Sequence, residues 1–305
     1  MASLAAALLV GVMLVCAQVW GAPLVQALGL EQNAPLGKLV NLNATHAALE
    51  EPRSDGLAAG DPINVLVLGV DAKPEDEHGG SARRSDTIML VQVSPDSGMV
   101  KLLSMPRDLM VEVEPGVEGK INSAYAYGGI SQTISALENY ADIPIDHYAI
   151  VDFEGFEAVV DDIGGVRLDV EEGDLPPDVR LKKEGVQHLN GRRALLYARY
   201  RGTAGGDLDR IERQQELVAA LRSKALHWNG VRRLPQVAAT IEKHVETDMG
   251  VRDAVALGSV LLKHGRGARM TATQLKGTPE TLPNGVEVLK PDHQVNQALL
   301  REFRY

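Results

Sequence analysis

Runs of apolar residues separated by polar loops predict strands and helices along the chain from residue 62 onward. Residues 63–69 form an almost continuous apolar run, which is typical of a strand buried on both faces. Residues 87–93 and 99–105 have the composition of two further strands. Because a Ser-Pro-Asp-Ser-Gly turn separates them, we expect these two strands to form a hairpin.

The pattern then alternates between helical and strand periods. Helical spacing of apolar residues predicts helices over residues 130–140 and 154–163 and a strongly amphipathic helix over 209–226. Residues 191–197 are predicted to form a short helix or a turn. Residues 147–153 and 166–170 are predicted strands. This mixture of strands and helices predicts an α/β domain built in layers around a central sheet.

The first 30 residues contain no charged side chain, and the first charge is Glu31. Roughly 20 apolar residues are enough to span the hydrocarbon core of a bilayer. We interpret residues 1–30 as one N-terminal transmembrane helix; a cleaved signal peptide is the alternative, although it normally has a basic start and a shorter apolar core. Residues 31–61 are expected to be a linker with one short helix near 42–50, and residues 62–305 a single folded domain.

Composition excludes several functional classes. The formal net charge is −10 and the isoelectric point is about 5.3, which argues against general affinity for nucleic acid. Cys16 is the single cysteine, so the remainder of the chain can contain no disulfide, Cys-ligated zinc or thiol nucleophile. The chain also lacks an HExxH motif, a GxSxG nucleophile elbow and a GxxxxGK[ST] phosphate loop.

Against this acidic background, four arginines gather around one glycine-bearing turn: Arg199, Arg201, Arg210 and Arg213. Guanidinium groups bind phosphoryl oxygens bidentately, and the start of a helix adds free N–H groups and its dipole. The stretch therefore predicts a receptor for phosphate or pyrophosphate. The alternative is a solvated helix with weak surface ion pairs.

The helix that follows this turn suits an amphiphilic ligand. Asp209 and Glu212 have the spacing of a capping box, which places the start of the helix at Arg210. Arg210, Arg213 and Gln214 then share one face, which Leu217 and Leu221 continue inward. This face would be polar at its mouth and apolar deeper down.

Two carboxylates are expected at the ends of neighbouring strands. Asp71 follows the strand 63–69 and Asp86 precedes the next strand. Such a pair could hold Mg²⁺, which prefers a few carboxylates together with phosphate oxygens and water, although either aspartate alone is more often a turn or cap residue. Arg107, just after the third strand, could join the phosphate site or pair with Asp108.

Together these segments resemble the LytR–CpsA–Psr family of bacterial cell-envelope proteins. They occur in the order of the family and cover about residues 61–220, and a later family segment is found within 275–303. The matching pieces are VLGVD (67–71), RSDTI (84–88), SMPRD (104–108), KINSAYAYGG (120–129), VDFEGF (151–156), VDDIGGV (160–166), and YARYR (197–201) with residues 207–215.

The resemblance implies an α/β/α layered domain with a mixed central sheet, anchored in the bacterial cell membrane by a single pass and lying outside the cytoplasm. It implies binding of a polyprenyl-pyrophosphate-linked glycopolymer with Mg²⁺, and transfer of the glycopolymer phosphate onto peptidoglycan. Carried over by motif, Asp71 and Asp86 would hold the metal. The pyrophosphate would be bound by Arg84, Arg107, Arg199, Arg201, Arg210 and Gln214.

For the chemistry, Asp71, Arg107 and Arg210 are the catalytic candidates, with Asp71 as either metal ligand or base. Two other functions share the same site. One is a pyrophosphatase that transfers to water, and the other is a lipid-binding envelope regulator without turnover.

Overall fold

The computed structural model describes residues 61–70, 85–170, 185–200, 234–249 and 269–304, together with ten positions between 213 and 257. The chain divides into two units. We call Ala44–Tyr148 with Arg269–Tyr305 the sheet unit, and Ala149–Ala268 the helical unit. Each is described by itself below.

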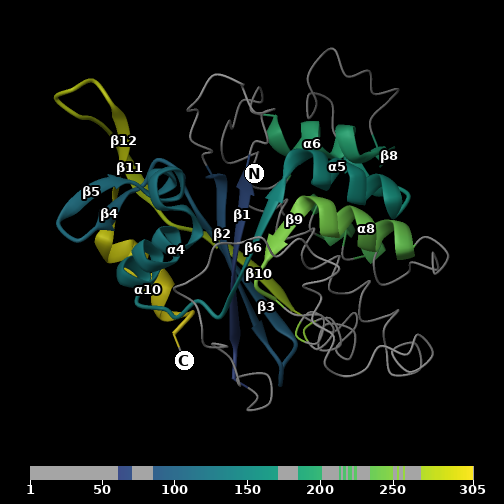
Figure 1. Ribbon diagram of the computed structural model, residues 1–305, viewed down its shortest axis with the longest axis horizontal. Helices are drawn as coiled ribbons and strands as arrows, with labels where there is room; N and C mark the ends of the chain where they lie inside the picture. The colour runs from purple at the N-terminus through teal and green to yellow at the C-terminus, as the bar shows by residue number, and fades with distance from the viewer. Residues whose placement is uncertain are drawn as a thin grey trace. The chain divides into compact units, whose positions relative to one another are not determined.

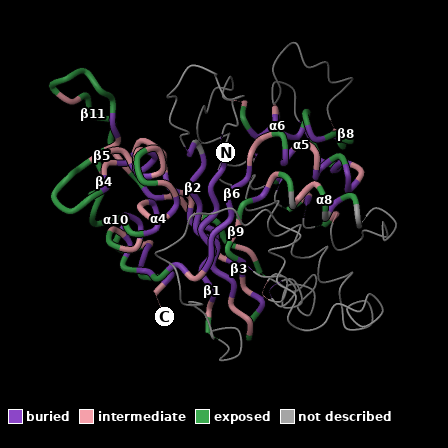
Figure 2. The backbone as a smooth tube through the Cα atoms, viewed as in Figure 1, coloured by how far each residue is buried: buried purple, intermediate pink, exposed green. Residues whose placement is uncertain are grey.

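Four strands form the centre of the sheet unit: β1 (Ile63–Val70), β2 (Ser85–Ser94), β3 (Met99–Met105) and β10 (Met270–Gln274), hydrogen-bonded in the order β10-β3-β2-β1 (Figure 1). β1 and β3 are both antiparallel to β2, while β10 is parallel to β3, so the sheet is mixed. Every residue of β1 is buried (Figure 2), as its continuous apolar run predicts. The three predicted strands and the hairpin between the second and third are confirmed.

Two exposed hairpins extend from this sheet unit. The first pairs β4 (Met110–Glu114) with β5 (Val117–Lys120), and the second pairs β11 (Gly277–Thr281) with β12 (Glu287–Pro291). Leu109 forms a parallel bridge with Leu289, which joins the two hairpins. The sequence pattern did not predict these short, polar strands.

Two helices, α4 (Ile121–Ala141) and α10 (His293–Arg301), complete the sheet unit. α4 begins nine residues before the predicted helix 130–140. Gly129, at φ 62° and ψ −152°, interrupts its helical backbone, so two helical pieces are joined at a kink. The predicted helix 130–140 is therefore the second of these two pieces.

The helical unit contains the helices α5 (Phe153–Asp162), α6 (Gly191–Arg199) and α8 (Leu234–His244) and the strands β6 (His147–Asp152, from Ala149 onward), β7 (Val166–Val170), β8 (Gly185–Leu189) and β9 (Val245–Thr247). β6 pairs with β9 and β7 pairs with β8, both antiparallel. The predicted helices 154–163 and 191–197 and strands 147–153 and 166–170 agree with these elements to within one or two residues. Within the predicted helix 209–226, the eight described positions are all helical.

Two N-caps fix the starts of α5 and α6. The Asp152 carboxylate accepts a hydrogen bond from the Gly155 N–H (2.5 Å), and the Asn190 side chain accepts one from the Arg193 N–H (3.1 Å). These bonds satisfy backbone donors that a helix start leaves without partners. α6 is therefore held at the end opposite to Arg199.

No helix within the described ranges is both long enough and apolar enough to cross a bilayer. The expected transmembrane segment 1–30, the linker 31–61 and its short helix lie outside those ranges.

Candidate functional site

The paired ends of β1 and β2 contain an irregularity at Asp86. Gly69 pairs with Thr87 and Val70 pairs with Ser85, so Asp86 is the extra residue of a β-bulge. Bulges are over-represented next to active sites, where they redirect a side chain. Asp71 is the next residue after Val70, at the same end of the strand pair.

Two hydroxyl groups flank this bulge. Ser85 and Thr87 are buried, and within the described part of the chain neither hydroxyl has a hydrogen-bond partner. A buried hydroxyl without a partner costs free energy, so such groups call for a ligand or a role. Gly69 allows the strands to approach closely here, because a Cβ at that position would lie 2.7 Å from the Thr87 Cβ.

These residues fit a hard cation by the chemistry of their donors. Asp71 and Asp86 are carboxylates, and Ser85 and Thr87 add hydroxyl oxygens, all of them the type of donor that Mg²⁺ prefers. Among the side chains that the structure describes, no group of three or more His, Cys, Asp and Glu residues forms a metal-binding cluster. The side chains of Asp71 and Asp86 lie outside that search.

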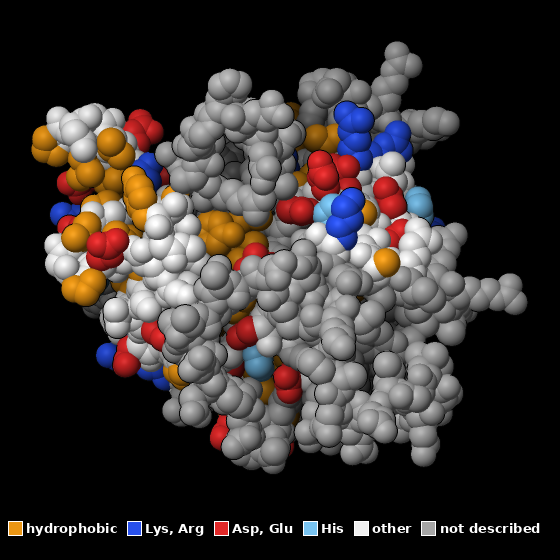
Figure 3. Space-filling model, in the orientation of Figure 1, with side chains coloured by type: hydrophobic (Ala, Val, Ile, Leu, Met, Phe, Trp, Pro, Cys, Tyr) orange, Lys and Arg blue, Asp and Glu red, His pale blue; other side chains and the backbone are white. Residues whose placement is uncertain are grey.

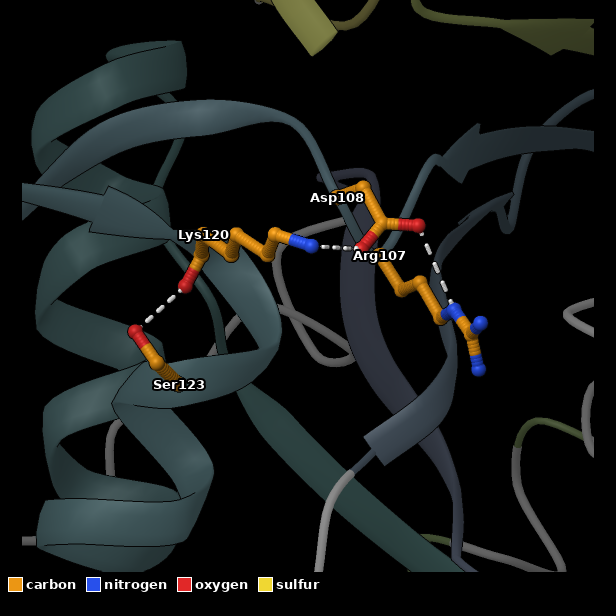
Figure 4. Close-up of polar contacts among 4 residues, drawn as sticks. All are labelled: Arg107, Asp108, Lys120 and Ser123. Atoms are coloured by element: carbon orange, nitrogen blue, oxygen red, sulfur yellow. Dashed lines mark hydrogen bonds and ion pairs between the residues drawn. The ribbon is translucent and has the colours of Figure 1, made fainter. Parts of the chain in front are cut away.

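Arg107 lies in a charged cluster after β3, shown in Figure 4. Its Nε is 3.4 Å from Oδ2 of Asp108, while Nζ of Lys120 is 2.8 Å from the other carboxylate oxygen. The Arg107 side chain is 38% exposed, and its two terminal nitrogens point away from Asp108 (Figure 4). The structure thus contains the Arg107–Asp108 pair, one of the two roles considered for this arginine.

The backbone around Arg107 is held by the start of α4. The carbonyl oxygen of Arg107 accepts a hydrogen bond from the Asn122 N–H (3.2 Å), and that of Leu109 accepts one from the Ile121 N–H (2.9 Å). The Ser123 hydroxyl donates to the carbonyl oxygen of Lys120 (2.6 Å), as Figure 4 shows. Since the segment is tied to a helix, Arg107 and Lys120 belong to one rigid corner.

Arg199 is the last residue of α6 and is exposed. Its guanidinium carbon lies 4.5 Å from the centre of the Phe153 ring, a cation–π arrangement that fixes the orientation of the side chain. An exposed, oriented guanidinium is a suitable phosphate ligand.

The charges around Arg199 are mixed. On the face in Figure 3, side chains of Lys and Arg and those of Asp and Glu gather together over α5 and α6. The pKa of Glu157 on α5 is raised, mainly because burial disfavours the charged carboxylate; Arg192 and Arg199 lower it, while Asp161 and Glu154 raise it.

The sequence predicts that Arg213 faces a ligand together with Arg210, but the side chain of Arg213 is buried. It is only 3% exposed, its Nη2 donates a hydrogen bond to the carbonyl oxygen of Tyr200 (2.8 Å), and its guanidinium carbon lies 5.9 Å from the Tyr200 ring centre. One helical turn later, Glu216 accepts a hydrogen bond from the Tyr197 hydroxyl (2.5 Å). Arg213 thus contributes to packing at the end of α6.

The hydrogen bonds from Arg213 to Tyr200 and from Tyr197 to Glu216 join the residues on either side of the segment 201–212. Tyr200 immediately precedes residues 201–212, and Arg213 immediately follows them. The buried Leu217 and Leu221 continue the inner side of the helix, as expected. Asp71, Arg84, Arg201, Arg210 and Gln214 lie outside the described residues.

Comparison with known proteins agrees with these motifs. The chain matches the LytR_cpsA_psr family over residues 37–304. It belongs to this family. The resemblance drawn from the ordered motifs is confirmed, and the mixed α/β fold is that of solved members.

Two curated relatives are each 34% identical to the chain. One is the polyisoprenyl-teichoic acid–peptidoglycan teichoic acid transferase TagV of Bacillus subtilis, aligned over 209 residues, 65% of this chain and 53% of TagV. The other is the transferase TagU of Halalkalibacterium halodurans, with the same descriptive name, aligned over 226 residues, 73% of this chain and 72% of TagU. The chain thus spans only about half the length of TagV.

Among solved structures, that of TagT bound to LI-WTA superposes with a TM-score of 0.66 and 28% identity, covering 80% of this chain and 90% of that one. The mixed α/β architecture with its central sheet is therefore shared with this structure.

Proposed function

We propose that this protein is a phosphotransferase of cell-wall assembly. It moves a glycopolymer phosphate from a polyprenyl-pyrophosphate carrier onto peptidoglycan. Family membership supports the proposal, together with the names of TagV and TagU, which are transferases acting between polyisoprenyl-linked teichoic acid and peptidoglycan. Nucleic acid is not among the proposed partners, because the chain is acidic.

The observation that carries the catalytic assignment is the bulge at Asp86. A β-bulge whose sequence neighbours, Ser85 and Thr87, carry buried hydroxyls without partners among the described residues is difficult to explain by stability alone. Asp71 and Asp86 would hold Mg²⁺, which when bound supplies positive charge beside the phosphoryl oxygens. The remaining pyrophosphate ligands would be Arg84, Arg107, Arg199, Arg201, Arg210 and Gln214.

In the reaction, a hydroxyl of the acceptor sugar attacks the phosphorus next to the glycopolymer. A new P–O bond forms to the acceptor, the P–O–P bond breaks, and the lipid leaves as its phosphate. Asp71 is the candidate to take the hydroxyl proton when it is not serving as a ligand. The arginines offset the charge that develops on the phosphoryl oxygens and the leaving phosphate.

Residues 1–30 would keep this site beside the lipid carrier. Their length and lack of charge suit a single membrane span, and the catalytic residues would then lie outside the cytoplasm, where the acceptor wall is.

The test is transfer of labelled glycopolymer from lipid pyrophosphate to peptidoglycan by the full chain. Asp86→Ala and Arg210→Ala should each lower the transfer rate by about 10²–10³-fold, the usual cost of removing one group that stabilises transition-state charge. Asp96→Ala, in the exposed turn between β2 and β3, and Arg192→Ala, on the exposed side of α6, are matched controls that should retain the parent rate.

The products distinguish the three functions. Release of lipid phosphate without glycan attachment would indicate a pyrophosphatase, and bound lipid without turnover would indicate a regulator. Unchanged transfer in both Asp86→Ala and Arg210→Ala would refute the proposed site.

A further inference from the structure

The sheet unit contains a cavity of about 430 Å³ that none of the proposed site residues line. Its walls come from β4, β5, the last turn of α4, the β11–β12 hairpin and α10. The volume falls within the range of ordinary small-ligand pockets. A cavity of this size, built from six elements of one unit, can hold a ligand of a few rings.

The lining combines aliphatic and polar side chains. Met110, Val111, Leu282, Val288 and Pro291 contribute the aliphatic part, and Val111 and Val288 are buried. On the face in Figure 3, orange hydrophobic side chains lie over the two hairpins among charged and other atoms. Such a lining can contact the C–H faces of a sugar.

Hydrogen-bonding side chains supply the rest of the wall. Asn139 and Gln297 carry amides with both donors and acceptors. Glu280 and Lys290 lie across the second hairpin, 3.6 Å apart. Paired donors and acceptors of this kind match the hydroxyl and acetamido groups of a glycan.

Tyr140 adds an aromatic ring and a directed donor. Its hydroxyl oxygen accepts a hydrogen bond from Nδ2 of Asn296 (3.0 Å), and no described residue accepts its hydrogen. Burial raises the pKa of Tyr140, an effect that the Asn296 hydrogen bond partly offsets, so the hydroxyl keeps its proton at neutral pH. It can therefore donate to a sugar oxygen.

The charge of the lining selects against anions. Glu112 and Glu118, directly opposite each other on the first hairpin, join Glu280 as three carboxylates, against one lysine, Lys290, and one histidine, His293. Like charges placed directly opposite each other across a hairpin are unfavourable. A phosphate-bearing polymer would be repelled here, while neutral hydroxyl groups can donate hydrogen bonds to the carboxylates.

We propose that this cavity binds an uncharged, N-acetylated glycan segment, and that it holds the sugar chain of the acceptor. The second half of this statement rests on the proposed function. The link to that function is the backbone of β12: the Leu289 N–H, between Val288 and Lys290 of the cavity wall, donates to the carbonyl oxygen of Asp108 (2.8 Å). The cavity wall is thus bonded to the residue adjoining Arg107.

Binding is tested by calorimetric titration of the full chain in detergent with chitotetraose, an uncharged N-acetylated oligosaccharide. Asn139 is exposed, and its side chain makes no hydrogen bond to a described residue, so Asn139→Trp would fill the cavity without breaking such a bond. Glu118→Ala would remove one hydrogen-bond acceptor from the cavity wall. Each should weaken binding by about tenfold, equivalent to about 1.4 kcal/mol. Glu287→Ala, an exposed β12 glutamate that does not line the cavity, is the matched control and should bind within about twofold of the parent.

Three results would overturn the glycan assignment: no binding by the parent chain, unchanged binding by Asn139→Trp, or binding of poly(glycerol phosphate) that Asn139→Trp abolishes. Each of these results tests glycan binding at the cavity and does not depend on whether the protein catalyses transfer.

The acceptor role has its own readout. Asn139→Trp should raise the KM for the glycan acceptor by about tenfold while leaving kcat at saturating acceptor near that of the parent; an unchanged KM would refute this role. Arg210→Ala should lower the transfer rate by about 10²–10³-fold yet bind chitotetraose normally. Absence of glycopolymer transfer by the parent chain would refute the proposed function while leaving the cavity assignment intact.

Discussion

Gly191 at the start of α6 lies against the backbone of Glu157 on α5, where a side chain would not fit. Replacing Gly191 with alanine therefore tests the packing of α6 against α5. A Cβ at this position would lie 2.0 Å from the carbonyl oxygen of Glu157 and 2.6 Å from two further backbone atoms of that residue. Ordinary contacts of a Cβ begin at 3.4 Å, so the two helices would have to separate by about 1.4 Å. The backbone cannot rotate away as the tip of a side chain can.

The size of the effect follows from three contributions. Overpacking costs about 1–3 kcal/mol. Separation also stretches the bond from the Gly191 N–H to the Asp161 carboxylate (2.7 Å), worth about 1 kcal/mol. The better helix propensity of alanine returns at most about 1 kcal/mol. We expect Gly191→Ala to lower the free energy of unfolding by about 2 kcal/mol.

Urea unfolding followed by circular dichroism measures this loss. With a slope of about 2 kcal/mol per molar, the midpoint should fall by about 1 M. Gly119→Ala is the matched control, because its added Cβ would approach only side-chain atoms, at 3.1 Å from Ser123 Oγ and Val113 Cγ2. A midpoint for Gly191→Ala equal to that of the parent would refute the close packing of α5 against α6, and with it the placement of Arg199.

Two further predictions concern the same unit. Burial raises the pKa of Glu157, so the folded state favours the protonated carboxyl. The resulting contribution to the free energy of unfolding is complete below the unfolded-state pKa of about 4.5 and is lost as pH rises through the folded-state pKa. Glu157→Gln should therefore gain stability relative to the parent as pH rises from 4 to 7, with no difference at the acid end; thermal unfolding across this range checks it, and a gain confined to low pH would contradict it. Arg213→Met should lower the free energy of unfolding by about 1–3 kcal/mol, because the partly buried carbonyl of Tyr200 loses its donor. Chemical unfolding measures the loss, and a variant as stable as the parent would show that the contact contributes nothing.

Strong apolar periods made much of the fold predictable from the chain alone. Residues 63–69 could only be a buried strand, and the turn at 94–98 could only join two antiparallel strands. The hairpins β4–β5 and β11–β12 escaped prediction because their strands are only four or five residues long and three of the four are largely exposed. β4 does alternate, with Val111 and Val113 buried, but only over five residues. The cavity between those hairpins consequently had no signature in the sequence.

The candidate site residues were predicted from residue type and order, and they remain predictions. Arginines around a turn, and aspartates at strand ends, indicate phosphate and metal chemistry wherever they are placed. The local sequence could not separate Arg213 from its neighbours, since all four arginines have the same chemistry. Only packing distinguishes a guanidinium that is buried against Tyr200 from one that is exposed at the end of α6.

The sequence by itself determined the family, the mixed α/β class and the set of charged residues available to a phosphorylated ligand, because periodicity and residue type are local properties. The tertiary structure decided that Asp86 is the extra residue of a bulge, that Arg107 shares Asp108 with Lys120, and that a polar cavity lies beside β12. These features depend on register and on contacts between residues far apart in the chain. Register and long-range contact arise only when the whole chain packs.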